Sequence, residues 1–211
     1  MLAACVALLL LVAVAANECG PAAAQAPPET EGVSDVLALA RICRHEAGFP
    51  PRRGRGARAW WDHGDDCPAI YAVIERVRLS LSRGRSEPVS VARAVFAYSR
   101  GRAFDRTRTD PACDVAWLDE SGSEPRCWRA GVPWESRREA WLAVVEHARA
   151  VLAGQVTHRC TVPPLHWGCG RFPPGHERAG EWRCNDHERA ARAGWVEVSC
   201  GRTDNSFWIE P

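Results

Sequence analysis

The chain has 211 residues, 46% of them apolar, so it can bury a sizeable core, and its length favours one domain. Its 27 basic residues are all arginine and are balanced by 26 acidic residues, so a net charge of +1 argues against a nucleic-acid-binding surface. No glycine-rich phosphate loop, dinucleotide fingerprint or serine nucleophile elbow occurs, and we expect no bound cofactor.

The N-terminal segment is typical of an export signal. Residues 2–16 form an apolar run that is shorter than the ~20 residues of a membrane-spanning helix. Small residues around Ala24 suit a signal peptidase, although the positively charged start of a signal peptide is missing. We expect residues 1–24 to be a signal peptide or a signal-anchor that later releases, residues 25–33 a linker, and residues 34–211 one domain. The mature protein is then exported and has no stable membrane span.

Residues 34–48, SDVLALARICRHEAG, predict the helix around which the domain is organised. Ser34 suits the N-cap, and helical spacing places Glu46 on the apolar face. The polar face carries Arg41, Arg44 and His45. Partial burial and the negative end of the helix dipole both favour the protonated form of Glu46, as a general acid requires. The alternative interpretation is a solvated surface acid or an ion-pair partner of Arg41.

The loop that follows this helix is rich in proline, glycine and arginine, and it holds Trp60 and Trp61. Because this loop leaves the helix directly after Glu46, the two tryptophans are candidates for lining a substrate cleft beside that acid. The alternative is that both indole rings only pack over the core.

Three more helices are predicted from apolar residues at helical spacing. The first covers residues 67–81, with Asp65 or Asp66 as its cap, and the second covers residues 90–99, capped by Ser90. The third covers residues 136–152. A polar loop at 101–133, tied down by Cys113 and Cys127, separates the last two helices.

The last third of the chain, residues 155–211, differs from the rest because it has proline and glycine breaks and no long helical period. Short strands are expected at 195–198 and 207–209, and a short helix is expected at 185–193. The predicted fold class is therefore mainly α (α+β), with an irregular, disulfide-rich C-terminal part.

Eight cysteines follow the predicted signal: Cys43, Cys67, Cys113, Cys127, Cys160, Cys169, Cys184 and Cys200. An even number in an exported protein predicts up to four disulfides, whose connectivity the spacing leaves open. We expect Cys43 to pair with Cys67, because the first lies on the inward side of one helix and the second at the start of the next.

One constellation competes with the disulfides. His166, Cys169, Cys184 and His187 form H-x₂-C-x₁₄-C-x₂-H, a spacing that suits tetrahedral zinc. Export favours a Cys169 to Cys184 disulfide instead, with Cys160 and Cys200 as the remaining pair. The prediction is a metal-free protein whose last third is held by disulfides.

Several segments, in this order, resemble the cell-wall hydrolases related to the spore-cortex-lytic enzyme. They are LARICRHEAG, CPAIYAVIERVR, EPRCW, REAWLAVVEHARAVLAG, LHWGC and CGRTDNSFW. The resemblance runs patchily over residues 36–208 and implies a lysozyme-like fold and cleavage of peptidoglycan glycan strands.

The resemblance also assigns residues. Glu46, within His-Glu-Ala-Gly, matches the family's catalytic glutamate, and Trp128 matches an aromatic residue of a short cysteine-tryptophan element. His166 and Trp167 fall where the family has an aromatic pair near the cleft, and Asn205 stands where a histidine is common. These positions are expected to contact the substrate.

Glycan cleavage needs a proton on the leaving oxygen and stabilisation of an oxocarbenium-like centre. With one strong acid in view, we expect a monomeric lytic transglycosylase that cleaves between N-acetylmuramic acid and N-acetylglucosamine. A muramidase-type hydrolase needs a second carboxylate, for which Asp62, Asp65 and Asp66 are the nearest candidates. The rival of another class is a non-catalytic secreted module whose tryptophans bind glycan.

Overall fold

The computed structural model describes residues 30–47, 64–101, 103–104, 115–125, 133–172, 175 and 177–211. The predictions for the signal segment and for Asp62, Trp60, Trp61, Trp128, Cys113 and Cys127 lie outside the described residues. Among the described residues, no helix is long and apolar enough to cross a membrane.

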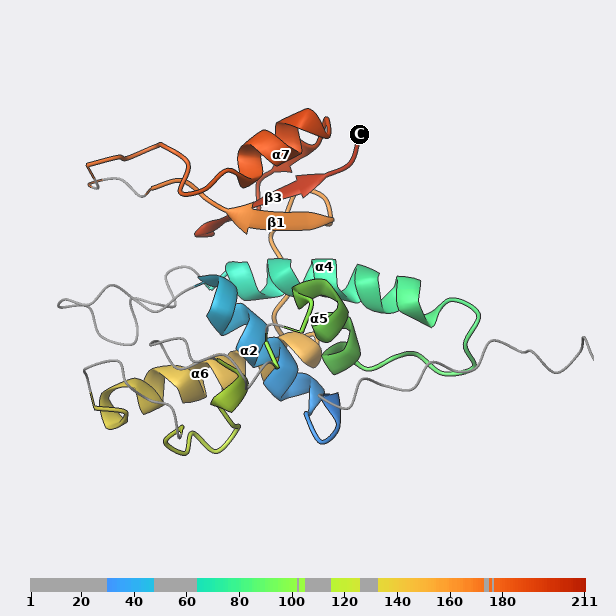
Figure 1. The fold of residues 1–211 in the computed structure, drawn as a ribbon, viewed down its shortest axis with the longest axis vertical. Helices are drawn as coiled ribbons and strands as arrows, with labels where there is room; N and C mark the ends of the chain where they lie inside the picture. Colours follow the sequence, from blue (N-terminus) through green and yellow to red (C-terminus); the bar gives the residue numbers. More distant parts are fainter. Residues whose placement is uncertain are drawn as a thin grey trace, which may run out of the picture.

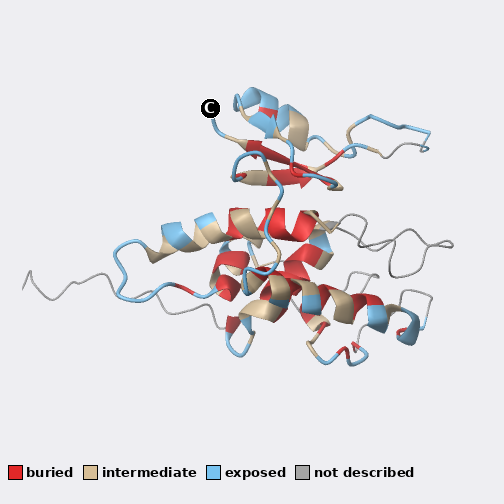
Figure 2. Ribbon diagram, turned by 180° about the vertical axis from the view of Figure 1, so that it is seen from behind, coloured by how far each residue is buried: buried red, intermediate tan, exposed pale blue. Residues whose placement is uncertain are grey.

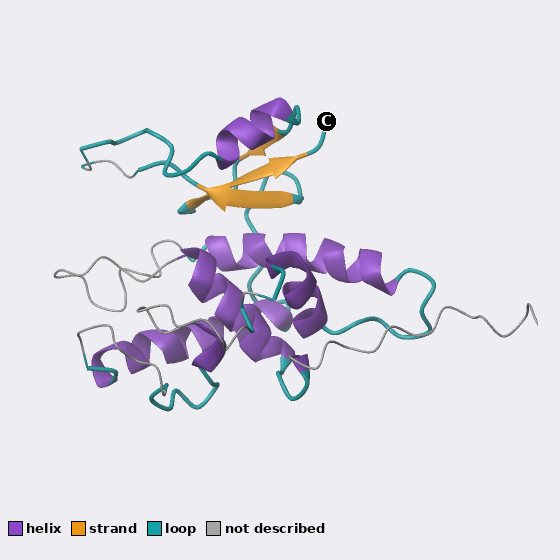
Figure 3. Ribbon diagram, viewed as in Figure 1, coloured by secondary structure: helices purple, strands orange, loops and turns teal. Residues whose placement is uncertain are grey.

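A layer of helices lies on one side of a small sheet, and one short helix covers the other side (Figures 1 and 3). The helical layer contains α2 (Asp35–Ala47), α4 (Asp66–Ser82), α5 (Val91–Ser99), α6 (Glu135–Leu152) and the 3₁₀ turn η3 (Val115–Trp117). The sheet contains β1 (His166–Cys169), β2 (Val196–Val198) and β3 (Asn205–Ile209), and α7 (Asp186–Arg192) covers it. This arrangement confirms the mainly α (α+β) class.

Helix α2 is the centre of the helical layer, where it contacts α4, α5, α6 and η3. The Ser34 hydroxyl accepts a hydrogen bond from Leu37 N at 3.0 Å, so the predicted cap is confirmed. The prediction of a polar face through Arg41 is wrong, because Arg41 is only 2% exposed. Its guanidinium donates to the Leu118 carbonyl through Nε at 3.1 Å and Nη2 at 2.7 Å. The η3 segment therefore covers that side of the helix.

The other predicted helices are present with boundaries shifted by one residue at most. The Ser90 hydroxyl accepts from Arg93 N at 3.1 Å, which confirms the cap of α5. Asp65 is the N-cap residue of α4, one of the two predicted positions, but its side chain makes no capping hydrogen bond. Both carboxylates instead accept hydrogen bonds from the loop that leads into β3.

The sheet has the strand order β1-β3-β2, with both pairs antiparallel. Strands β2 and β3 and helix α7 confirm the elements predicted for the last third. Strand β1 was not predicted, because four residues including Gly168 show too little periodicity. It forms by pairing with β3, in a register that sets Trp167 opposite Phe207. Both of these side chains belong to the core cluster shared with the helical layer.

Buried residues concentrate where the helices of the lower layer meet and where the sheet faces them (Figure 2). Three predicted disulfides are present: Cys43–Cys67, Cys160–Cys200 and Cys169–Cys184. The first joins α2 to α4, and the second joins the segment after α6 to the loop before β3.

We expect the Cys43→Ala, Cys67→Ala double variant to be less stable than the wild type. The bond closes a loop with a sequence separation of 24. Such a closure stabilises a fold by about 3 kcal/mol in the chain-entropy model, or roughly 6 to 12 °C in melting temperature for a chain of this size. Calorimetry measures the shift, and peptide mapping without reduction identifies the bond. Recovery of Cys43 and Cys67 as free thiols from the oxidised wild type would contradict the assignment.

Candidate functional site

A cleft of about 710 Å³ opens where the helical layer meets the sheet and α7. It is bordered by the C-terminal ends of α2 and α5, by β1, by the first half of α7 and by the start of β3. The lining residues are His45, Glu46, Tyr98, Ser99, Arg100, His166, Trp167, Gly168, Cys169, Arg183, Asp186, Arg189 and Asn205. Four residues predicted for the site, namely Glu46, His166, Trp167 and Asn205, are therefore brought together.

Glu46 lies in the last turn of α2 and is partly buried. Its backbone carbonyl accepts a hydrogen bond from Asn205 Nδ2 at 3.3 Å, which ties the end of the helix to the start of β3. No hydrogen bond or ion pair joins its carboxylate to another residue in the described part of the chain. The backbone of Glu46 is held in place, whereas its acid group is uncommitted and faces the cleft.

Asp66 holds the end of α2 and the start of β3 together. It is 1% exposed, and its carboxylate accepts hydrogen bonds from Asp204 N at 2.8 Å, Asn205 N at 3.1 Å and Asn205 Nδ2 at 3.1 Å. Burial raises the pKa of Asp66 to about 6, and these N–H donors limit the rise because they favour the charged form. One buried carboxylate thus connects α4, β3 and, through Asn205, the end of α2.

The two described candidates for a second catalytic carboxylate do not line the cleft. Asp66 faces the backbone before β3, and Asp65 Oδ2 accepts from Arg202 N at 2.9 Å. Asp65 Oδ1 also lies 3.5 Å from Arg159 Nε. Both acids therefore hold the loop that leads into β3. The carboxylate that lines the cleft together with Glu46 is Asp186.

Tyr98, at the end of α5, forms part of the floor of the cleft. Its ring stacks on Trp167 with centroids 4.0 Å apart. Burial is the main cause that raises the pKa of Tyr98 to about 12, and the charges of Glu46 and Asp186 add to it. A backbone hydrogen bond with Trp167 and the charge of Arg189 act in the opposite direction. The phenol stays protonated near neutral pH and offers a hydrogen-bond donor beside two carboxylates.

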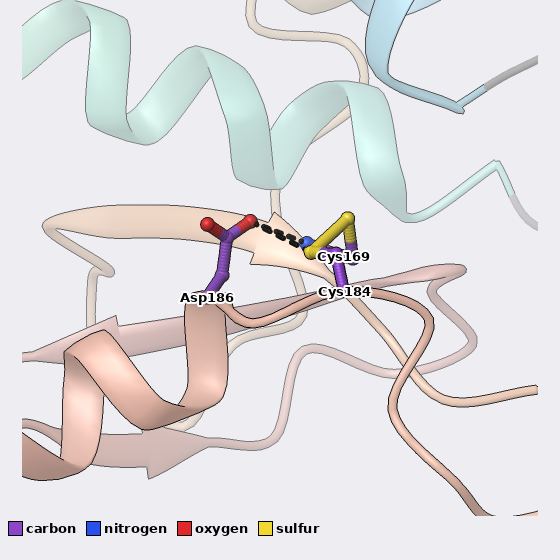
Figure 4. A group of neighbouring side chains, drawn as sticks. All are labelled: Cys169, Cys184 and Asp186. Carbon is purple, nitrogen blue, oxygen red and sulfur yellow. Dashed lines mark hydrogen bonds between the residues drawn. A yellow bond between two sulfur atoms is a disulfide. The ribbon is translucent and has the colours of Figure 1, made fainter.

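Asp186 and Cys169 line the cleft, and the Asp186 carboxylate lies beside the Cys169–Cys184 disulfide (Figure 4). Asp186 Oδ2 accepts from Cys169 N at 3.2 Å and lies 3.1 Å from Cys184 Sγ. Asp186 and these two cysteines are the only group of three potential metal ligands among the described residues. Because the two sulfurs are bonded to each other, they do not offer the thiolates that a zinc site requires.

The two histidines of the zinc pattern do not belong to that group. The ring of His166 stacks on Trp195 at 3.7 Å, and its Nε2 lies 3.3 Å from Glu210 Oε1. The ring of His187 stacks on Trp182 at 4.8 Å. The residues of H-x₂-C-x₁₄-C-x₂-H therefore do not converge on one point, and the structure supports the disulfide interpretation of the cysteines.

Two of the residues predicted to contact the substrate, Trp167 and Asn205, are largely buried. Trp167 is 8% exposed and is stacked on Tyr98, so little of its ring is open to the cleft. Asn205 is 6% exposed, and its amide nitrogen donates to Asp66 and Glu46, which makes it a link in the framework. Sequence reasoning missed Tyr98, Asp186 and the cleft arginines, because no local pattern distinguishes them from ordinary helix-end residues.

Comparison with known proteins found no matching family model, no similar curated protein and no similar solved structure.

The buried Asp66 should give the protein a specific pH dependence. Its folded-state pKa of about 6 lies above the ordinary value of 3.8, so the native protein binds the extra proton between these pH values. The contribution of Asp66 to the free energy of unfolding therefore decreases as pH rises through this window, by about 3 kcal/mol.

Asp66→Asn removes this titration. We expect the free energy of unfolding of the wild type, minus that of the variant, to be larger at pH 4 than at pH 7. Denaturant unfolding at the two pH values measures it, and Glu87→Gln, an exposed change outside the junction, is the control. Parallel pH profiles for wild type and Asp66→Asn would show that the group does not titrate in this way.

Proposed function

We propose that the protein is an exported enzyme that cleaves the glycan strand of peptidoglycan between N-acetylmuramic acid and N-acetylglucosamine, as a lytic transglycosylase with Glu46 as its acid. One observation carries the proposal. Glu46 is a partly buried carboxyl group with no hydrogen-bonding or ion-pairing partner among the described residues, and it faces a cleft of about 710 Å³. The resemblance of the sequence to cell-wall hydrolases names the same residue.

The proposed reaction needs one group that first donates and later accepts a proton. Protonated Glu46 donates its proton to the glycosidic oxygen, and the bond from that oxygen to the anomeric carbon breaks as positive charge develops on the sugar. A hydroxyl of the same sugar then attacks the anomeric carbon and gives its proton to the Glu46 carboxylate. The product carries an anhydro ring, and the acid returns to its starting state without a water molecule.

Two neighbours support this role. Tyr98 is a neutral donor in the same cleft, and the charge of Glu46 is one of the causes that raise its pKa, so the phenol is placed to hydrogen-bond to a sugar oxygen beside the acid. The Asn205 bond to the Glu46 carbonyl fixes the helix end that carries the acid. Such positioning contributes to catalysis because the reacting groups are already oriented.

A muramidase-type hydrolase is the second candidate, and Asp186 is the observation that favours it. This carboxylate lines the same cleft as Glu46, and a hydrolase needs a second carboxylate on the other side of the scissile bond. One of its oxygens is already engaged by Cys169 N. Only the other oxygen is left for a catalytic role, which is why we favour the route that needs one acid.

We expect Glu46→Gln to abolish cleavage while leaving the fold intact. General acid-base catalysis contributes about 10²- to 10⁴-fold, so the turbidity loss of a cell-wall suspension should slow by at least that range. Glu87→Gln, an exposed change outside the cleft, should clear the suspension at the wild-type rate. Near-normal clearing by a folded Glu46→Gln protein would reject Glu46 as the acid. Absence of clearing by the wild type, with binding to cell walls intact, would favour the non-catalytic glycan-binding module.

The products distinguish the two reaction types. We expect mass spectrometry of the soluble fragments to show anhydro ends, and we expect Asp186→Asn to keep forming them. Reducing ends from the wild type would establish hydrolysis and would make Asp186 the second carboxylate to test.

A further inference from the structure

Arg100 has a backbone conformation that arginine rarely adopts. It follows α5 as its C-cap, with φ 52° and ψ 42°, and its N–H donates to the Phe96 carbonyl. Ten described residues have a positive φ, and nine of them are glycine. Glycine is usual at such a position because a Cβ atom crowds the backbone there. The side chain of Arg100 is therefore unfavourable for the local fold, and a strained residue beside a cleft points to a functional reason.

Arg100 is also the uncommitted arginine of the cleft. Arg183 donates to the carbonyls of Gly170 and Asp204, so it supports the loop before β3. Arg189 lies over the ring of Trp195, 5.7 Å from its centroid. Arg100 is exposed, and its side chain makes no hydrogen bond and no ion pair with any residue in the described ranges. Its guanidinium lines the same cleft as Glu46 and is available to a ligand.

We propose that Arg100 binds a carboxylate group of the glycan in the cleft, and this inference rests on the proposed function. A guanidinium donates two parallel hydrogen bonds to a carboxylate, so it selects both charge and shape. Glu46 and Asp186 line the same cleft and repel a carboxylate, which leaves the neighbourhood of Arg100 as the place where an acidic substituent is accepted. Arg100 thereby makes the site prefer an acidic glycan over a neutral one.

Peptidoglycan offers carboxylates from two sources. One is the lactyl group of the muramoyl sugar, which is free where no peptide is attached, and the other is the stem peptide. Both present the same chemistry to Arg100. Three soluble ligands of equal sugar length separate them: peptide-free muramoyl strands, peptide-bearing strands, and chitooligosaccharides, which carry no carboxylate.

The test measures equilibrium binding of these ligands by calorimetry in the inactive Glu46→Gln protein, with and without Arg100→Gln. We expect Arg100→Gln to weaken binding of one or both acidic ligands about tenfold, and to leave the neutral ligand unchanged. The acidic ligand that loses affinity identifies the source of the carboxylate. Arg83→Gln removes the same charge from an exposed position at the end of α4, outside the cleft, and should change nothing.

Arg100→Gly provides a second readout, because it removes the guanidinium and relieves the backbone. We expect its melting temperature to rise by about 2 to 4 °C while acidic-glycan binding weakens as in Arg100→Gln. Equal loss for acidic and neutral ligands would assign Arg100 a structural role and overturn the inference. Unchanged acidic binding in both variants would overturn it as well. Failure of the parent protein to bind any of the three ligands would instead reject the proposed glycan function.

Discussion

The junction between the two layers depends on one buried carboxylate. Asp66 begins α4, yet it satisfies the backbone N–H groups of Asp204 and Asn205 and the side-chain amide of Asn205. Burying an acid costs free energy unless the acid is hydrogen-bonded, and burying a backbone N–H group costs free energy unless it has an acceptor. The Asp66 carboxylate and the N–H groups before β3 therefore satisfy one another. Because Asn205 also donates to the Glu46 carbonyl, the same contact that joins the layers sets the position of the proposed acid.

The cleft is a consequence of this junction. Helix α2 ends at it, β1 is held beside it by pairing with β3, and α5 brings Tyr98 under Trp167. The disulfides hold the surrounding segments together. Cys43–Cys67 joins α2 to α4, and Cys169–Cys184 joins β1 to the segment before α7, beside Asp186. The framework residues are therefore paired, whereas the side chains of Glu46 and Arg100 make no hydrogen bond or ion pair in the described structure. That contrast between paired and unpaired side chains is the reason why we propose the cleft as the binding site.

Local patterns predicted the helices and two of the three strands, because spacing and caps are encoded over a few neighbouring residues. They predicted Glu46 at the end of α2 for the same reason. The three disulfides were predicted from the even number of cysteines, from their places on the expected helices and from the expected export. Local patterns failed where a partner is distant in sequence. Arg41 looked like a surface residue until the Leu118 carbonyl was found to cover it, and Asp66 looked like a helix cap until Asp204 and Asn205 were found to bind it. The cleft residues that were missed, Tyr98 and Asp186, likewise depend on long-range contacts.

We propose that the acid of Glu46 acts on a glycosidic bond in this cleft. A crystal structure of the Glu46→Gln protein with a peptidoglycan oligosaccharide tests this role. We expect a sugar chain across the cleft, with the amide introduced at position 46 within hydrogen-bonding distance of a glycosidic oxygen. A sugar chain bound on another face of the protein, with the cleft empty, would contradict it.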